Sequence, residues 1–173
     1  MAMFDLGEDS PAEGNYDFTT ALSDAEIGEC GRLFAASVSR HYIAMGDLRA
    51  DRLDERLEWR ADLAEELERE IRGASGDVNY VAVRGRGGEG IVAILVVALN
   101  EGNKSAELGD LVVRKDWRGR GLGELVLRWL EAALRKRGFR RIVLESGAGN
   151  EAAHAFFERQ GFSPLAVEFV KEI

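Results

Sequence analysis

The sequence has little cysteine and no long apolar stretch. Cys30 is its only cysteine among 173 residues, so no internal disulfide can form, and one thiol does not make a zinc-ligand spacing. The longest uninterrupted apolar run, Ile91 to Leu99, has nine residues, about half of what a membrane-spanning helix needs. The opening residues, MAMFDLGEDSPAEGN, lack the basic start and apolar core of a secretory signal. We therefore expect a cytoplasmic protein without a membrane partner, in which Cys30 is a small apolar helix residue rather than a nucleophile.

Apolar residues make up 46% of the chain, which at this length is enough to bury one core. We find no internal repeat and no linker. The sequence therefore predicts a single domain over residues 16–173, after an acidic tail over residues 1–15.

Positive charge is scarce outside one stretch. The formal net charge is −8, yet residues 114–141 hold ten Lys/Arg and three Asp/Glu, a local +7 that leaves −15 for the rest. A solvated helix face explains part of this run. A basic pocket in an acidic protein favours a small polyanionic ligand over nucleic acid, which is more usually bound by a broad basic face. A nucleic-acid binder is the alternative, and its affinity would fall steeply with salt.

Hydrophobic periodicity predicts a chain of alternating strands and helices. Strands are expected at residues 16–22, 77–83, 90–99, 105–113, 139–146 and 164–173. Helices are expected from Ser23 or Asp24 as N-cap to about Ser39, from about Leu48 to Arg72, after Gly121, and over residues 150–161.

Two nucleotide-binding patterns can be excluded. Gly85 to Gly90 fits GxGxxG, but a dinucleotide fingerprint must open a helix, and this stretch opens a strand at Ile91. It is better interpreted as a hairpin loop. A P-loop also fails, because nothing after Gly119 supplies its glycine and lysine at the required spacing.

The stretch VVRKDWRGRGLGELVL has the context of an anion site. Gly119, Gly121 and Gly123 follow a strand and open an amphipathic helix. Unpaired backbone N–H groups and the positive end of the helix dipole attract an anion there, and glycines let a phosphate approach the backbone. Arg118 and Arg120 add positive charge. The pattern predicts phosphate or pyrophosphate binding without a metal, because no Ser or Thr follows to hold magnesium.

These residues resemble the GNAT superfamily of acyl-CoA-dependent N-acyltransferases. The family signature, Arg or Gln, two residues, Gly, one residue, then Gly or Ala, is matched by Arg118, Gly121 and Gly123. A second conserved segment resembles NEAAHAFFERQGF, with Asn150, Ala153, Gly161 and Phe162 in place. The two segments together cover about residues 105–163.

The resemblance implies an α/β (α+β) fold with a mixed, mostly antiparallel sheet of six or seven strands, splayed in the middle and flanked by about four helices. It implies acetyl-CoA as co-substrate, with its pyrophosphate on the backbone N–H groups of Arg118, Gly119, Arg120, Gly121, Leu122 and Gly123. The pantetheine arm would pair with Leu111, Val112 and Val113, and would lie near Asn150, Phe156 and Phe157. An edge strand can pair in this way through its backbone alone.

Transfer to an amine needs a proton acceptor, because an alkylamine is protonated at pH 7. Glu107, six residues before Val113, lies where part of the family, histone acetyltransferases included, carries its catalytic glutamate. Glu145, five residues before Asn150, matches a base of ribosomal-protein N-acetyltransferases. Asp110 is expected on the face opposite Glu107 by strand alternation. Each of these carboxylates could equally be a surface group at a strand end.

The sequence departs from the family at Phe157, where many members have a tyrosine that protonates the leaving thiolate. Phenylalanine cannot donate a proton, which leaves water, another side chain such as His154, or departure of the thiolate itself. A thiol of pKa about 8.5 is a fair leaving group.

The acceptor is least defined by the sequence. The acidic remainder of the chain favours a cationic small-molecule amine, and His41, Tyr42 and Asp47 lie where the family's substrate loop falls. A peptide N-terminus or a protein lysine is the alternative acceptor. A non-catalytic acyl-CoA sensor is an alternative of another class, and a homodimer is left open.

Overall fold

The computed structural model describes residues 15–74 and 76–171. All but the last residue of the predicted acidic tail lies outside them. The chain divides into two compact units. The first holds the residues up to Val38 together with Ala61–Leu144, and the second holds Ser39–Arg60 and the residues from Glu145 onward.

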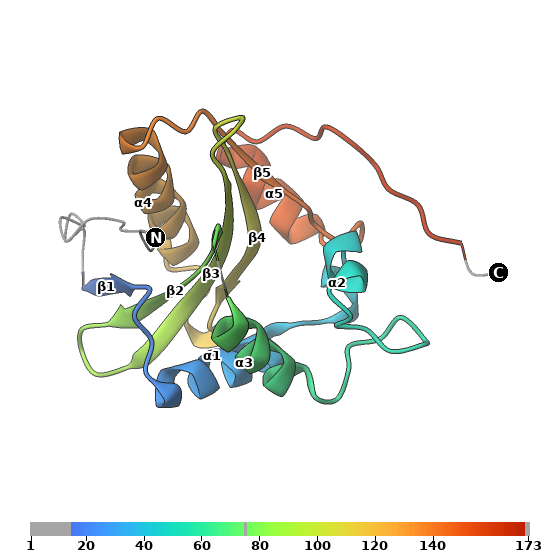
Figure 1. Cartoon of the computed structure of the whole chain (residues 1–173), viewed down its shortest axis with the longest axis horizontal. Helices are drawn as coiled ribbons and strands as arrows, with labels where there is room; N and C mark the ends of the chain where they lie inside the picture. Colours follow the sequence, from blue (N-terminus) through green and yellow to red (C-terminus); the bar gives the residue numbers. More distant parts are fainter. Residues whose placement is uncertain (1–14, 75, 172–173) are drawn as a thin grey trace. The chain divides into compact units, whose positions relative to one another are not determined.

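The first unit is built on one mixed sheet (Figure 1). Its strands are β1 (Tyr16–Thr19), β2 (Val78–Gly85), β3 (Gly90–Asn100), β4 (Ser105–Val113) and β5 (Arg141–Leu144). They lie in the order β1-β2-β3-β4-β5, antiparallel except for the parallel pair β4 and β5. The predicted mixed, mostly antiparallel sheet is confirmed.

Helices cover both faces of this sheet. On one face lie α1 (Asp24–Ser37) and α3 (Leu63–Gly73), where Arg84 of β2 binds Glu26 of α1 and Tyr80 binds Glu70 of α3. On the other lies α4 (Leu122–Lys136), where Phe18 of β1 stacks on Trp129 at 4.1 Å between ring centroids. Because both faces of β3 are covered, every residue from Ile91 to Val97 is buried, which is why this strand shows no polar alternation.

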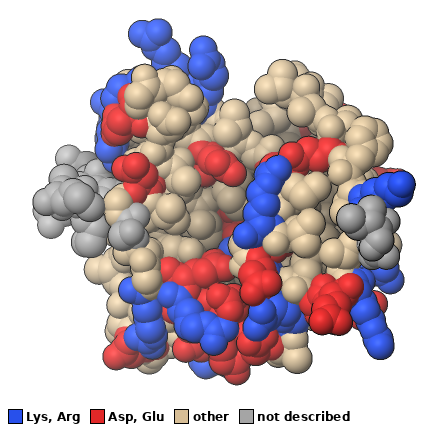
Figure 2. Space-filling view, turned by 45° about the vertical axis from the view of Figure 1, so that its right-hand side comes forward, with Lys and Arg blue, Asp and Glu red and all other residues tan. Residues whose placement is uncertain are grey.

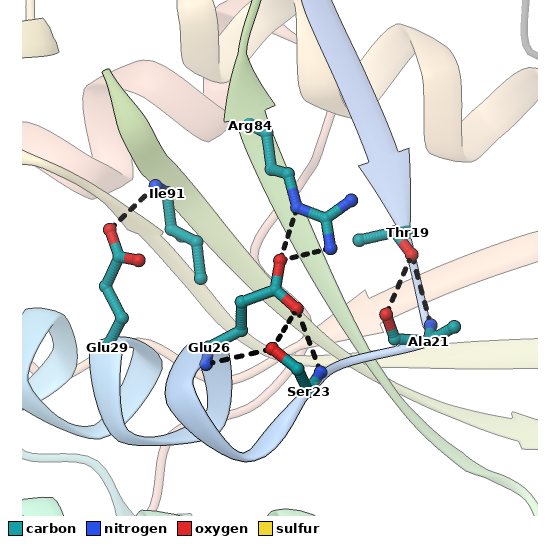
Figure 3. Close-up of polar contacts among 7 residues, drawn as sticks. All are labelled: Thr19, Ala21, Ser23, Glu26, Glu29, Arg84 and Ile91. Carbon is teal, nitrogen blue, oxygen red and sulfur yellow. Dashed lines mark hydrogen bonds and ion pairs between the residues drawn. The ribbon is translucent and has the colours of Figure 1, made fainter. Parts of the chain in front are cut away.

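Of the two predicted N-cap candidates, Ser23 is the N-cap of α1 and Asp24 is the first residue of the helix (Figure 3). Its hydroxyl accepts from the N–H of Glu26, and the Glu26 carboxylate accepts in return from the N–H of Ser23 at 2.8 Å. The other carboxylate oxygen of Glu26 accepts from Nε of Arg84 at 2.6 Å. One turn further on, Glu29 accepts from the N–H of Ile91 at 2.8 Å. The capping residue Glu26 therefore also links α1 to the sheet, because its carboxylate binds both Ser23 and Arg84.

The single helix predicted from about Leu48 to Arg72 is wrong over its first half. The structure has α2 (Met45–Arg49) and, after a turn region, α3. Asp54 accepts from the N–H groups of Arg56 and Glu58 at 2.8 and 3.0 Å. A side chain that binds its own neighbouring backbone competes with the helical ladder, and Leu57 has a left-handed φ of 54°. The helical spacing of apolar residues, with charges between them, therefore mimicked a helix here.

The second unit contains η1 (Arg40–Tyr42), α2 and α5 (Glu151–Arg159). A buried ion pair joins Arg52 to Asp47 at 3.3 Å. Burial raises the pKa of Asp47, against the lowering effect of the Ala44 N–H and of Arg52. Trp59 donates its ring N–H to the carbonyl of Ser39 at 2.9 Å. These polar contacts hold together a unit that has few buried apolar side chains.

The closing strand predicted over residues 164–173 is wrong within 164–171, the part that the structure describes. Leu165, Val167 and Phe169 are 92%, 79% and 89% exposed. Alternating apolar residues favour a strand, but a strand forms only where a neighbour takes up its backbone hydrogen bonds. The described residues thus hold five strands rather than six or seven, and five α-helices rather than about four. None of those helices is long and apolar enough to cross a membrane.

Candidate functional site

A glycine loop joins the end of β4 to α4. After η2 (Lys115–Trp117), Gly119 and Gly121 adopt positive φ values of 73° and 79°. Side chains are strained in this conformation, so these two positions favour glycine. Apart from the two chain neighbours of each glycine, no atom of residues 15–74 and 76–171 lies within 4 Å of where a Cβ would stand on Gly119 or Gly121. The loop backbone is therefore open to an approaching ligand.

The N-terminus of α4 has no side-chain cap. Gly121 is its N-cap, and the first backbone hydrogen bond of the helix runs from the N–H of Leu125 to the carbonyl of Gly121 at 3.0 Å. The N–H groups of the first turn, residues 122–124, have no partner within the helix. They lie at the positive end of the helix dipole, which suits an anion such as a pyrophosphate.

The arginines of this region are held in different ways. Arg118 donates from Nε to the carbonyl of Val113 at 2.9 Å and from Nη2 to that of Ser37 at 3.4 Å. Arg120 lies over the ring of Trp117 at 5.3 Å, and Arg114 lies over the same ring at 5.7 Å. Within the described residues neither Arg118 nor Arg120 forms an ion pair with a carboxylate, although the pKa of Asp116, which is lowered mainly by its hydrogen bond with Arg114, is also lowered by the charge of Arg120.

Much of the remaining basic run is paired with carboxylates. The pairs are Arg114–Asp116, Arg128–Glu124, Arg135–Glu131 and Arg137–Glu101. In the space-filling view, basic side chains gather at the upper left, over the C-terminal end of α4, and acidic and basic side chains are interleaved below (Figure 2). The run is thus partly a solvated helix face, as the sequence suggested, and the glycine loop retains Arg118 and Arg120 as its cations.

β4 separates from β5 at the middle of its length. Leu108 pairs with Leu144 at the end of the parallel ladder, whereas β4 continues to Val113. Within the described residues, Leu111–Val113 pair with β3 and have no strand partner on their other side, and this is the edge on which the resemblance places the cofactor arm. Arg118 already binds the Val113 carbonyl, and Val112 packs against the core cluster beneath α1.

Glu107 and Asp110 share one face of β4, contrary to the sequence expectation. Glu107 lies opposite Ala98 and Asp110 opposite Val96, and these two residues of β3 point to the same face. Gly109 is the extra residue of a β-bulge, which shifts the alternation by one. A glycine inside a strand pattern is the signal that could have revealed it.

Glu107 is exposed, and no hydrogen bond or ion pair holds its carboxylate within the described part of the chain. Its neighbour across the parallel ladder is Val143, which is 42% exposed. A carboxylate with both oxygens unengaged beside an exposed apolar side chain can accept a proton from a bound amine.

Asn150 is the N-cap of α5. Its side-chain oxygen accepts from the N–H of Ala153 at 3.3 Å, which leaves the amide NH₂ to donate elsewhere. In the same helix the ring of Phe157 makes edge contacts with Phe156 and Phe162, at 5.2 and 5.4 Å between centroids. Phe156 and Phe157 are both half-buried.

Glu145 is engaged, unlike Glu107. It accepts from the N–H of Gly46 at 2.8 Å and from Arg49 at 3.1 Å. His41 and Tyr42 form η1 in the same unit, and Gly149 lies against His41. Sequence reasoning missed these contacts, because they join residues about a hundred positions apart.

A family model described as "Acetyltransferase (GNAT) family" matches residues 44–162, more than half of the chain. The chain belongs to the GNAT family of acetyltransferases. A search of curated proteins finds no match.

Solved structures share the fold of this GNAT acetyltransferase at low sequence identity. An acetyltransferase from Thermus thermophilus is 23% identical, with a TM-score of 0.64, over 87% of this chain and 88% of that one. PaiA N-acetyltransferase from Thermoplasma acidophilum, in complex with coenzyme A, is 15% identical at 0.63, over 90% and 94%. The aminoglycoside acetyltransferase meta-AAC0020, from an uncultured soil metagenomic sample, is 12% identical at 0.59, over 94% and 99%.

The GNAT assignment makes the protein an acyl-CoA-dependent acetyltransferase, and acetyl-CoA is the co-substrate that the family uses. The open, uncapped glycine loop and its two cations fit the pyrophosphate of that molecule. No three His, Cys, Asp or Glu side chains gather as metal ligands within residues 15–74 and 76–171.

Proposed function

We propose that this protein transfers an acetyl group from acetyl-CoA to a primary amine of a cationic small molecule, with both substrates bound together. The proposal is carried by one stretch of the first unit. Between Glu107 and Gly123 the chain provides, in order, an unengaged carboxylate, a strand edge beyond its partner, and an open anion loop.

The loop binds the pyrophosphate through the backbone N–H groups of residues 119–123, because the N–H of Arg118 already donates to the Lys115 carbonyl at 3.3 Å. The side chains of Arg118 and Arg120 supply positive charge. The edge of Leu111–Val113 orients the arm, and Asn150 donates an amide hydrogen to it. Acetyl-CoA supplies an acetyl group activated as a thioester. Glu107 accepts the proton of the attacking amine, directly or through a water molecule.

Phe157 cannot protonate the departing sulfur. A thiolate is stable enough near neutral pH to leave without a general acid, because an ordinary thiol has a pKa of about 8.5. The sulfur is then protonated by water or by the His154 imidazole, or CoA leaves as the unprotonated thiolate and takes up a proton from solvent later.

The acceptor class is supported by charge. Outside the basic run the chain carries a net −15, and Glu107 and Asp110 share one face of β4. Acidic side chains around a binding site attract a cationic amine and disfavour an anionic acceptor. His41, Tyr42 and Asp110 are the proposed acceptor contacts. A peptide N-terminus or a protein lysine is the second candidate acceptor, since the same chemistry serves any amine.

The test is release of free thiol from acetyl-CoA in the presence of an amine panel of polyamines, aminoglycosides, amino-acid amides and peptides. Glu107→Gln keeps the shape of the side chain but cannot accept a proton. We expect it to lower turnover by about 100-fold or more, to abolish the acidic limb of the pH–rate profile, and to leave CoA binding unchanged.

Two controls separate the alternatives. Gly121→Glu places a strained side chain and a negative charge in the anion loop, so it should abolish the thermal stabilisation that CoA gives the unaltered protein. Stabilisation by CoA without thiol release for any amine would instead identify an acyl-CoA sensor. Unaltered turnover in Glu107→Gln would exclude Glu107 as the base.

A further inference from the structure

The Glu145 carboxylate is held at both oxygens by one short segment. Oε2 accepts from the N–H of Gly46 at 2.8 Å, and Oε1 accepts from Nη1 of Arg49 at 3.1 Å. Arg49 also donates from Nη2 to Glu168 at 2.7 Å. The arginine therefore bridges two carboxylates, and Glu145 contacts both ends of α2.

The backbone after Glu145 touches the preceding part of that segment. A Cβ on Gly147 would lie 2.5 Å from the carbonyl oxygen of Ile43 and 2.8 Å from that of His41. On Gly149 it would lie 3.3 Å from Nδ1 of His41. Only glycine permits the Gly147 approach, because a real Cβ does not come that close to a backbone atom.

These contacts join two functional regions within the second unit. Residues 145–149 lead directly into Asn150, which the proposed function assigns to the cofactor arm. Residues 40–49 carry His41 and Tyr42, the proposed acceptor contacts. The two hydrogen bonds of the Glu145 carboxylate and the close approach of Gly147 thus hold residues 40–49 against residues 145–149.

We propose that Glu145 is a positioning residue that, with Arg49 and Gly147, sets the distance between the bound amine and the cofactor arm. This inference rests on the proposed function. It assigns Glu145 a role different from that of a base, because a carboxylate whose two oxygens accept hydrogen bonds is poorly placed to take a proton from substrate. A misplacement of about 1 Å at reacting groups can lower a rate by about 100-fold.

The network can be removed without unfolding the protein. The side chains of Arg49 and Glu145 are 60% and 38% exposed, and ion pairs at such exposure contribute little to folding. Substitution of Glu145 therefore tests the position of residues 40–49 rather than the folding stability of the protein. Glu131 pairs with Arg135 at 2.8 Å in α4, with side chains 29% and 74% exposed, and offers a control for loss of a partly exposed ion pair.

We expect Glu145→Ala to raise the KM for the amine and to lower kcat/KM by about 10- to 100-fold. The Kd for CoA and the acidic limb of the pH–rate profile should be unchanged. Arg49→Met should give a defect of the same kind, and Glu145→Ala/Arg49→Met should be no worse than the more severe single variant, since both substitutions break the Arg49–Glu145 contact. Glu131→Ala should behave as the unaltered protein.

Hydrogen–deuterium exchange gives a readout that does not depend on turnover. Exchange of the amides of residues 40–49 should rise in Glu145→Ala and in Arg49→Met, and should not rise in Glu131→Ala. If no amine in the panel releases thiol from the unaltered protein, the proposed function fails, whereas the exchange result still decides whether the clamp exists.

Three results would overturn the inference. The first is loss of the acidic limb in Glu145→Gln, which would make Glu145 a base. The second is unchanged amine kinetics in Glu145→Ala. The third is unchanged exchange over residues 40–49 in that variant.

Discussion

Cys30 shows how burial governs the chemistry of a single residue. None of its surface is exposed, and burial, assisted by the charges of Glu29 and Glu26, raises the pKa of the thiol from 9.0 to about 12. The neutral thiol is unreactive, because the thiolate is the nucleophile. The sequence interpretation of Cys30 as an apolar helix residue agrees with this environment.

We expect Cys30 to resist a thiol-reactive disulfide reagent at pH 8 in the folded protein and to react at once in denaturant. The raised folded-state pKa also sets a pH dependence. The contribution of Cys30 to stability is complete below the ordinary thiol pKa and falls as the pH rises toward about 12, because only the unfolded state ionises readily in that window. Rapid labelling of the native protein would contradict the burial of this side chain.

Phe157 is the residue at which this chain departs from the family pattern. Its half-buried ring touches Phe156 and Phe162 by their edges. Phe157→Tyr should fold, bind CoA as before and release thiol at least as fast, because a phenol of pKa about 10 can donate to a developing thiolate. Melting temperature and initial rate are the two measurements. A loss of about 1–3 kcal/mol without a change in rate would show that the added hydroxyl is buried without a partner.

At the scale of the elements, one glycine decides how closely α1 and α3 pack. A Cβ on Gly31 of α1 would lie 2.5 Å from the carbonyl oxygen of Ala64 and 3.1 Å from Cγ of Glu68, both in α3. The two helices can therefore approach with backbone against backbone. The helical periodicity of α1 was readable from the sequence, but the role of Gly31 depends on α3.

Gly31→Ala should lower the free energy of unfolding by about 1–3 kcal/mol, because overpacking forces the helices apart. Gly73 is the last residue of α3, and outside its own helix and its chain neighbours no atom of the described residues lies within 4 Å of its Cβ position. Gly73→Ala should therefore be neutral or stabilising by up to about 1 kcal/mol, since alanine favours the helix. Urea unfolding of both variants checks the contrast, and equal effects at the two positions would contradict it.

At the scale of the whole molecule, two segments that are both rich in apolar residues differ in how much of their side chains is buried. Phe34 in α1 is 2% exposed, whereas Phe169 near the C-terminus is 89% exposed. Both were expected from the sequence to lie in regular elements, yet only the first contributes to a core.

Phe34→Ala should cost about 3–5 kcal/mol of unfolding free energy, the usual loss for a buried aromatic side chain. Phe169→Ala should change it by less than about 0.5 kcal/mol, as exposed substitutions do. Chemical denaturation measures both. A large loss at Phe169 would mean that residues 164–171 pack as the closing strand that their alternating pattern predicted.

The features that the sequence determined by itself are those carried by near neighbours. The Ser23 cap, the buried run of β3 and the glycine loop before α4 all depend on residues within a few positions of one another. For that reason the candidate anion loop and the family resemblance could be recognised before the structure was known, and the mixed sheet was expected only because the resemblance implied it.

The tertiary structure decided everything that depends on residues far apart in the chain. The bulge at Gly109 places Glu107 and Asp110 on one face, and its register is set against β3. The engagement of Glu145 by Gly46 and Arg49 joins positions nearly a hundred residues apart. An alternating or helical pattern states which conformation a segment favours, but whether a strand finds a partner or a carboxylate stays unengaged is settled only by the neighbours that folding supplies.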